Sequence, residues 1–70
     1  MLLALAPINV EFKIIKVLLD CKTKKHLENL SIIPNSKITV LENNKGNVIL
    51  HVKEGRLALD KNVASKIIIA

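Results

Sequence analysis

The chain has 70 residues, half of them hydrophobic, and a formal net charge of +5. This length allows one domain, expected over residues 1–70, whose core only just offsets the entropy lost on folding. Cys21 is the single cysteine, so no intramolecular disulfide can reinforce the core, which fits the reducing cytoplasm. The apolar segment 1–6 lacks the cationic flank of a signal peptide and the ~20 residues that span a bilayer, so no direct membrane insertion is expected.

The positive charge comes from ten lysines and one arginine, spread from Lys13 to Lys66. Only Lys22, Lys24 and Lys25 are clustered, and no aromatic residue stands between them to stack on bases. We therefore interpret the charge as an ordinary solvated surface and expect no nucleic-acid partner. A small basic RNA-binding barrel remains the alternative from another functional class.

The first strand is predicted over residues 10–17, where hydrophobic and polar side chains alternate. Val10, Phe12 and Ile14 share the face expected to point inward. Ile15 follows Ile14 and breaks the alternation, which predicts a bulge or a bend of the kind that small, strongly curved barrels need.

A short helix is predicted over residues 23–30, where hydrophobic side chains recur at spacings of three and four. Asp20 or Thr23 is expected to cap its start, and Pro34 ends it because the residue before a proline avoids helical geometry. A helix of two turns is not stable alone, so it must pack against the sheet.

Two further alternating runs, residues 37–40 and 48–52, flank an Asn- and Gly-rich loop over residues 42–47. Strands of this length around such a loop are typical of an antiparallel hairpin. In the second run His51 alternates with hydrophobic residues, so its side chain is expected to point away from the interior.

The pattern of residues 54–69 predicts one more turn, two strands and a helical turn. The turn is expected at Glu54 and Gly55, and the fourth strand follows it with its leucines facing inward. Asp60 is expected to cap the helical turn, which precedes a short fifth strand over residues 67–69.

Together these elements predict a mainly β fold, a small SH3-like antiparallel barrel of about five strands with one short helix after the first strand and a helical turn before the last. The oligonucleotide-binding fold is the nearest competitor, but it usually has longer strands and places its helix between the third and fourth strands. The sequence contains no phosphate-cradling glycine loop and no nucleophile elbow, so the chain is not expected to be an enzyme.

The order and spacing of four motifs resemble the ferrous iron transport protein A (FeoA) family. Residues 27–35, LENLSIIPN, resemble its Leu-rich helix end followed by Gly, two apolar residues and Pro-Gly. Residues 37–41 follow where that family has its second strand. Residues 55–59, GRLAL, resemble its apolar-Ala-apolar strand, and residues 64–67, ASKI, resemble its terminal Ala-x-x-Ile. The likeness covers essentially the whole chain.

The resemblance implies a function in ferrous iron uptake. Family members are cytoplasmic and accompany a FeoB-type membrane transporter that has a GTP-binding domain. The implied role is that of a non-enzymatic accessory or regulatory protein that binds the cytosolic portion of this transporter. Similar domains also occur at the C-terminus of metal-dependent repressors. The resemblance does not imply that the chain itself carries iron.

Two positions depart from the family pattern, since Ser31 and Asn35 stand where glycine is usual. If both need a positive φ, Asn35 adopts it with little strain, whereas Ser31 costs on the order of 1 kcal/mol relative to glycine. These departures bear on local stability and leave the chemistry unchanged.

Residues that could bind a metal are few. Cys21 and His26, with Asp20 and Glu28 nearby, form the one group with ligand character, and His51 lies on a different predicted element. Two further ligands would have to come from elsewhere, so neither a metal site nor a cofactor is expected. A metal-responsive regulatory domain that uses Cys21, His26 or His51 stays open as an alternative.

Surplus aliphatic side chains are the candidate partner-binding surface, because the chain has more of them than the interior of one small barrel holds. The predicted residues lie at the helix end, in the turn after it and on the hairpin: Leu27, Leu30, Ile32, Ile33 and Ile49. The alternative for the first four is that they seal the helix onto the sheet. An open barrel edge is a further route to association, so a homo-oligomer also stays open.

Overall fold

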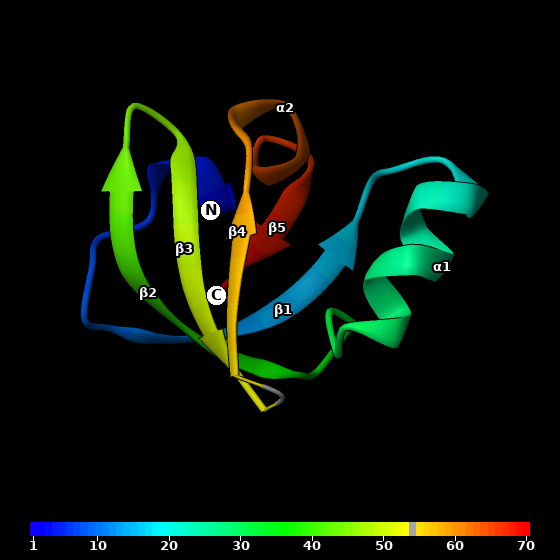
Figure 1. The fold of residues 1–70 in the computed structure, drawn as a ribbon, viewed down its shortest axis with the longest axis horizontal. Helices are drawn as coiled ribbons and strands as arrows, with labels where there is room; N and C mark the ends of the chain where they lie inside the picture. Colours follow the sequence, from blue (N-terminus) through cyan, green and yellow to red (C-terminus); the bar gives the residue numbers. More distant parts are fainter. Residues whose placement is uncertain (54) are drawn as a thin grey trace.

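The computed structural model describes residues 1–53 and 55–70, which form one curled antiparallel sheet with two short helices (Figure 1). The sheet order is β4-β3-β2-β1-β5. The predicted mainly β, SH3-like fold with five antiparallel strands is confirmed. In chain order the elements are η1 (Leu3–Leu5), β1 (Glu11–Val17), α1 (Cys21–Asn29), β2 (Lys37–Asn44), β3 (Asn47–Val52), β4 (Gly55–Leu59), α2 (Lys61–Ala64) and β5 (Ile67–Ile69).

The sheet bends at β1, because the first half of this strand pairs with β2 and the second half pairs with β5. The register with β5 shifts between Ile14 and Lys16, so Ile15 is the extra residue of a bulge. The predicted bulge is confirmed. The predicted inward position of Val10 is wrong, because Val10 precedes β1 and is 44% exposed.

The core is aliphatic, as the composition predicts, and every strand contributes to it. In β2 and β3 buried side chains alternate with more exposed ones, which is the pattern of a sheet with one face on the core. The largest side chains that are less than 2% exposed are Leu3, Ile14, Ile32, Ile38, Leu50, Ile67, Ile69, Val40 and Val48. Residues from η1 and from the turn after α1 thus complete a core that the strands alone do not close.

The helix α1 has Asp20 at its N-cap position and ends in a Schellman motif. The Ile32 N–H donates to the Leu27 carbonyl at 2.9 Å, and the Ser31 N–H donates to the Glu28 carbonyl at 3.1 Å. These are the two hydrogen bonds that define the motif. They satisfy carbonyl groups that the end of a helix would otherwise leave without partners.

Both positions at which glycine is usual in the FeoA family have a left-handed backbone. The φ angle is 68° at Ser31 and 74° at Asn35. Asparagine tolerates this region well, whereas serine carries on the order of 1 kcal/mol of backbone strain relative to glycine. Both residues therefore have the positive φ that glycine adopts most easily, as the family pattern suggests.

The predicted hairpin is confirmed, and its turn is tighter than the sequence suggests. β2 continues to Asn44 and β3 begins at Asn47, so only Lys45 and Gly46 connect them. Their φ angles are 53° and 96°. Two positive φ values are what a type I′ turn requires, and this turn matches the right-handed twist of the flanking strands.

At one end of the sheet β4 pairs with β3 through five residues. The predicted turn before it lies partly outside the described residues, since Glu54 is not described and Gly55 begins the strand. Leu59 is buried and Leu57 is half-buried, so the inward orientation of the leucines is confirmed. Within residues 1–53 and 55–70, neither helix is long and apolar enough to cross a membrane.

Asp60 caps α2 as predicted, because its Oδ1 accepts a hydrogen bond from the Val63 N–H at 2.9 Å. Replacing Asp60 with alanine is expected to lower the free energy of unfolding by about 1 kcal/mol, since that N–H loses its partner. Urea unfolding followed by circular dichroism measures the change. Asp60→Asn keeps an oxygen acceptor and is the control; an equal loss in both variants would contradict the capping role.

Candidate protein-binding surfaces

Two of the five predicted partner-binding residues are buried. Leu27, in the last turn of α1, is 3% exposed, and Ile32, in the turn after the helix, is 1% exposed. The Schellman motif joins these two residues, and a hydrophobic contact between them commonly accompanies it. Both side chains therefore hold α1 against the sheet, and a partner would reach them only if the helix moved.

The other three predicted residues are accessible to different degrees. Ile33 is 41% exposed, whereas Leu30 and Ile49 are half-buried. Leu30 packs on the edge of the core at the end of α1, and Ile49 lies on β3 opposite Ala58 of β4. Their role in binding a partner remains a prediction, and Ile33 is the most accessible of the five.

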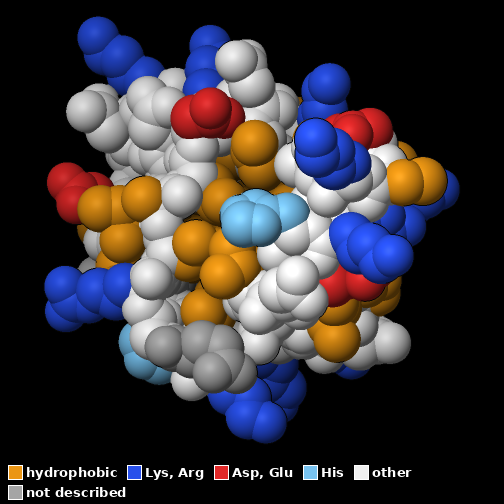
Figure 2. All heavy atoms as spheres, turned by 45° about the vertical axis from the view of Figure 1, so that its right-hand side comes forward, with side chains coloured by type: hydrophobic (Ala, Val, Ile, Leu, Met, Phe, Trp, Pro, Cys, Tyr) orange, Lys and Arg blue, Asp and Glu red, His pale blue; other side chains and the backbone are white. Residues whose placement is uncertain are grey.

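Further exposed hydrophobic side chains lie near the end of β1. Ile15 and Leu18 are each 48% exposed. Figure 2 shows hydrophobic side chains gathered in the middle of the face on the α1 side, next to a histidine and bordered by lysines. Leu18 is not among the partner-binding residues predicted from the sequence, and it directly follows the end of β1. This side of the molecule therefore offers apolar surface to a partner.

The residues with ligand character do not form a metal site in the part of the chain that the structure describes. No group of three or more His, Cys, Asp or Glu side chains comes together among the described residues. Cys21 and His26 are both exposed on α1, and His51 is exposed on β3. Hydrogen bonding to the Thr23 side chain lowers the pKa of Asp20 from its ordinary value of 3.8, so this carboxylate stays charged at neutral pH.

The register of the sheet brings together cations that are far apart in the sequence. Lys13 of β1 lies directly opposite Lys37 of β2, and His51 of β3 lies opposite Arg56 of β4. Thr39 lies between the two pairs. It is two residues from Lys37 on the same face of β2, and it lies opposite His51 of β3. The four basic side chains are exposed. Four basic residues that are scattered along the sequence thus come together in space.

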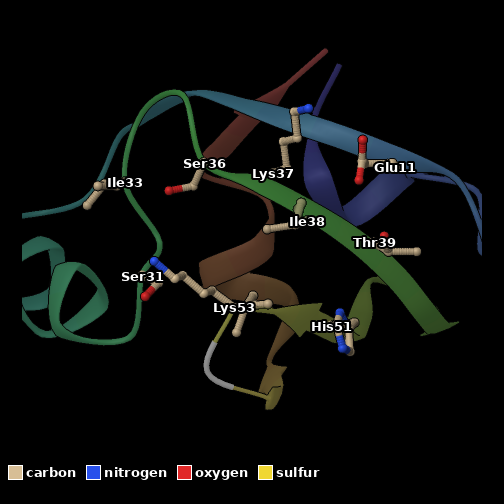
Figure 3. Close-up of a pocket in the computed structure, with 10 residues that line it drawn as sticks. Glu11, Ser31, Ile33, Ser36, Lys37, Ile38, Thr39, His51 and Lys53 are labelled. Carbon is tan, nitrogen blue, oxygen red and sulfur yellow. The ribbon is translucent and has the colours of Figure 1, made fainter.

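A hollow of about 490 Å³ lies beside these cations, between the turn after α1 and the strands β2 and β3 (Figure 3). Lys37, Thr39 and His51 line it from the strands, and Ile33 lines it from the turn. The Lys53 side chain points across it toward Ser31. Five exposed basic side chains lie on the sheet and around this hollow, and we call the surface that they form the basic face: Lys13, Lys37, His51, Lys53 and Arg56.

The opposition of Lys13 and Lys37 is unfavourable for the fold. The backbone N–H and carbonyl of Lys13 both bond to Ala70, at 2.8 Å and 2.9 Å. Toward β2, Lys13 is therefore in a non-hydrogen-bonded pair, the kind in which opposite side chains come closer. Like charges directly opposite each other destabilise a sheet. Glu11, two residues from Lys13 on the same face and diagonally across from Lys37, offsets part of this repulsion.

The fold and these two surfaces define a small SH3-like β domain that presents one exposed apolar surface and one basic surface. The family model described as the FeoA domain matches residues 1–70. The chain therefore belongs to the FeoA family, and the resemblance inferred from the order of its motifs is confirmed.

Three solved structures have the same fold. A crystal structure described as "Iron Uptake Regulatory Protein (FeoA)" has a TM-score of 0.89 and 21% identity, and the match covers 99% of this chain and 93% of that one. The solution structure of the FeoA protein from Chlorobium tepidum has a TM-score of 0.86 and 16% identity, with coverage of 99% and 68%. The FeoA-like protein from Clostridium acetobutylicum has a TM-score of 0.81 and 19% identity, with coverage of 100% and 84%. No match to the chain is found among curated protein sequences.

Proposed function

We propose that the chain is a cytoplasmic, non-enzymatic accessory protein of ferrous iron uptake that binds the cytosolic portion of a FeoB-type, GTP-dependent Fe(II) transporter. The observation that carries the proposal is the match of the FeoA domain to residues 1–70. The similar crystal structure is described as an iron uptake regulatory protein, which supports a regulatory role for this fold.

The apolar surface on the α1 side is the proposed contact with the transporter. Ile33 is 41% exposed, and Leu30 lies half-buried at the helix end three residues before it. Exposed aliphatic side chains of this kind gain free energy when a partner removes them from water, at about 25 cal/mol per Å². The buried Leu27 and Ile32 beneath them hold the turn in one conformation, so the partner meets a surface that is already ordered.

Replacing Ile33 with glutamate is expected to weaken binding to the purified cytosolic portion of the transporter by at least about tenfold, because a charge would be buried in the apolar contact. The fold should be retained, since this side chain lies on the surface and its replacement creates no core cavity. Isothermal titration calorimetry measures the affinity, and circular dichroism checks the fold.

The matched control is Leu5→Glu, which changes a hydrophobic side chain that is 73% exposed on η1. This variant should bind the transporter as the unchanged chain does. Failure of the unchanged chain to bind the cytosolic portion would contradict the proposal, as would unaltered Fe(II) uptake in cells from which the chain has been deleted.

A further inference from the structure

We propose that the basic face binds an acidic peptide segment of a protein partner, with one of its carboxylates seated in the hollow between Lys37 and Lys53. This inference concerns a second surface, which is basic where the contact proposed for the transporter is apolar, and the two surfaces meet at Ile33. It does not depend on which protein supplies the segment. Three features carry it: the charge of the face, the lining of the hollow and the shortage of aromatic side chains.

The charge of the basic face calls for an anionic ligand. Four Lys or Arg side chains and one histidine make up the face, and the chain as a whole carries a net charge of +5. Lys13 and Lys37 stand opposite each other in the close, non-hydrogen-bonded arrangement. A carboxylate of the bound peptide that lies beside these two lysines would reduce the repulsion between them. Their pairing is therefore less unfavourable in the bound chain than in the free one.

The hollow offers the groups that a carboxylate binds. Two lysines line the hollow, Lys37 and Lys53, together with the hydroxyl residues Ser36 and Thr39. In Figure 3 the Lys53 side chain points across the hollow, whereas the Lys37 side chain extends from β2 toward β1. Hydrogen bonds from charged donors to a carboxylate are roughly twice as strong as bonds between neutral groups. A volume of about 490 Å³ is large enough for side chains of a bound peptide and falls in the range of ligand pockets.

The lining favours a peptide over a nucleic acid. Phe12 is the one Phe of a chain that has no Trp or Tyr, and it is half-buried against the core, so no such ring is free to stack on bases. Ile33 lines the hollow with an exposed aliphatic side chain, which suits an aliphatic residue of a peptide. Glu11 also lines it, next to Thr39, and would repel a densely charged phosphate backbone. Glu11 repels a carboxylate as well, but a peptide can place an uncharged residue beside Glu11, whereas a nucleic acid has a phosphate at every nucleotide.

The probe for the test is a fluorescein-labelled, acetylated hexapeptide of five glutamates and one leucine, titrated at about 0.15 M salt, where the Debye length is about 8 Å, and followed by fluorescence anisotropy. Saturable binding is expected, with backbone amide NMR shifts concentrated on β2 and β3 around Thr39 and His51. Lys37→Glu and Lys53→Glu should each weaken the affinity by at least about tenfold, because each reverses a charge beside the bound carboxylate. Lys37→Arg keeps the charge and should bind the peptide as the unchanged chain does.

The matched control is Lys25→Glu, which changes the net charge equally at an exposed position on α1. It should change the peptide affinity by less than about twofold, since exposed charges beyond a Debye length are screened. Lys37→Glu should not lower the unfolding temperature, because it replaces a like-charge pair by an opposite-charge pair with Lys13. Weaker binding of this variant therefore cannot be attributed to unfolding.

Three results would overturn the inference. The peptide could fail to saturate, or Lys25→Glu could weaken it as much as Lys37→Glu does, which would show attraction to the net charge alone. Oligouridylate, or vesicles containing phosphatidylglycerol, could bind the basic face more tightly than the peptide does. Transporter binding is measured with the cytosolic portion of the transporter and peptide binding with the hexapeptide, so failure of either proposal can be told apart from failure of the other.

Discussion

Replacing Leu50 with alanine is expected to lower the free energy of unfolding by about 2–5 kcal/mol. Leu50 is 0% exposed and lies on β3 between Val40 of β2 and Leu57 of β4. Strands paired on both sides cannot close around the missing side chain, so a cavity remains. A domain of 70 residues has a total stability of roughly 4–10 kcal/mol, and this one change removes a large part of it.

Urea unfolding followed by far-ultraviolet circular dichroism measures this loss, since the chain has no tryptophan or tyrosine to report by fluorescence. Ile49→Ala is the matched control, because Ile49 is the adjacent residue of the same strand and is only half-buried on the other face. It should cost less than about 1 kcal/mol. Similar losses in the two variants would contradict the assignment of Leu50 to the centre of the core.

Replacing Asn43 with alanine is expected to lower the free energy of unfolding by about 1–3 kcal/mol. The Asn43 Nδ2 donates to the carbonyls of Ala4 and Ala6, at 3.0 Å each, and its Oδ1 accepts from the Gly46 N–H at 3.0 Å. One side chain thus ties the N-terminal segment to the hairpin and orders the turn. Its removal leaves three partly buried backbone groups without this partner. Losing one partner of a buried hydrogen bond costs more free energy than losing both, because the remaining group stays removed from water.

The effect of Asn43→Ala should be visible as local opening as well as lower stability. Amide hydrogen exchange at residues 2–6 should speed up more than exchange in β3, because the tie to η1 is lost while the sheet register is kept. Asn44→Ala is the control, since this neighbour is exposed, and it should stay within about 0.5 kcal/mol of the unchanged chain. Equal destabilisation of the two variants would contradict the role given to Asn43.

Much of the fold could be predicted because its signals are local. Alternation placed the hairpin strands and the inward leucines of β4, and the break after Ile14 predicted the bulge at Ile15. The cap at Asp60 followed from a preference that acts within one helical turn. The family could also be recognised from the sequence, since its motifs occur in the chain in the expected order and spacing, and these motifs consist mainly of core and turn residues.

The candidate surfaces could be predicted only in part. The sequence identifies an excess of aliphatic residues, but it cannot say which of them the core absorbs. Leu27 and Ile32 proved buried because the Schellman motif draws them together, whereas Ile33, the very next residue, is exposed. Val10 was predicted inward because it fits the alternation, yet the strand begins one residue later, and element boundaries depend on pairing with other strands.

By itself the sequence determined a small aliphatic β domain of the FeoA family. The alternation of hydrophobic and polar residues, the residues that favour turns and the residues that cap helices all act over only a few positions along the chain. The tertiary structure alone decided the basic face. Lys13, Lys37 and Lys53 are separated by 24 and 16 positions in the sequence. Only the pairing of β1, β2 and β3 places Lys13 opposite Lys37 and brings Lys37 and Lys53 to one hollow. Strand register depends on the whole core, because a slip of one residue would turn every side chain of a strand to the opposite face.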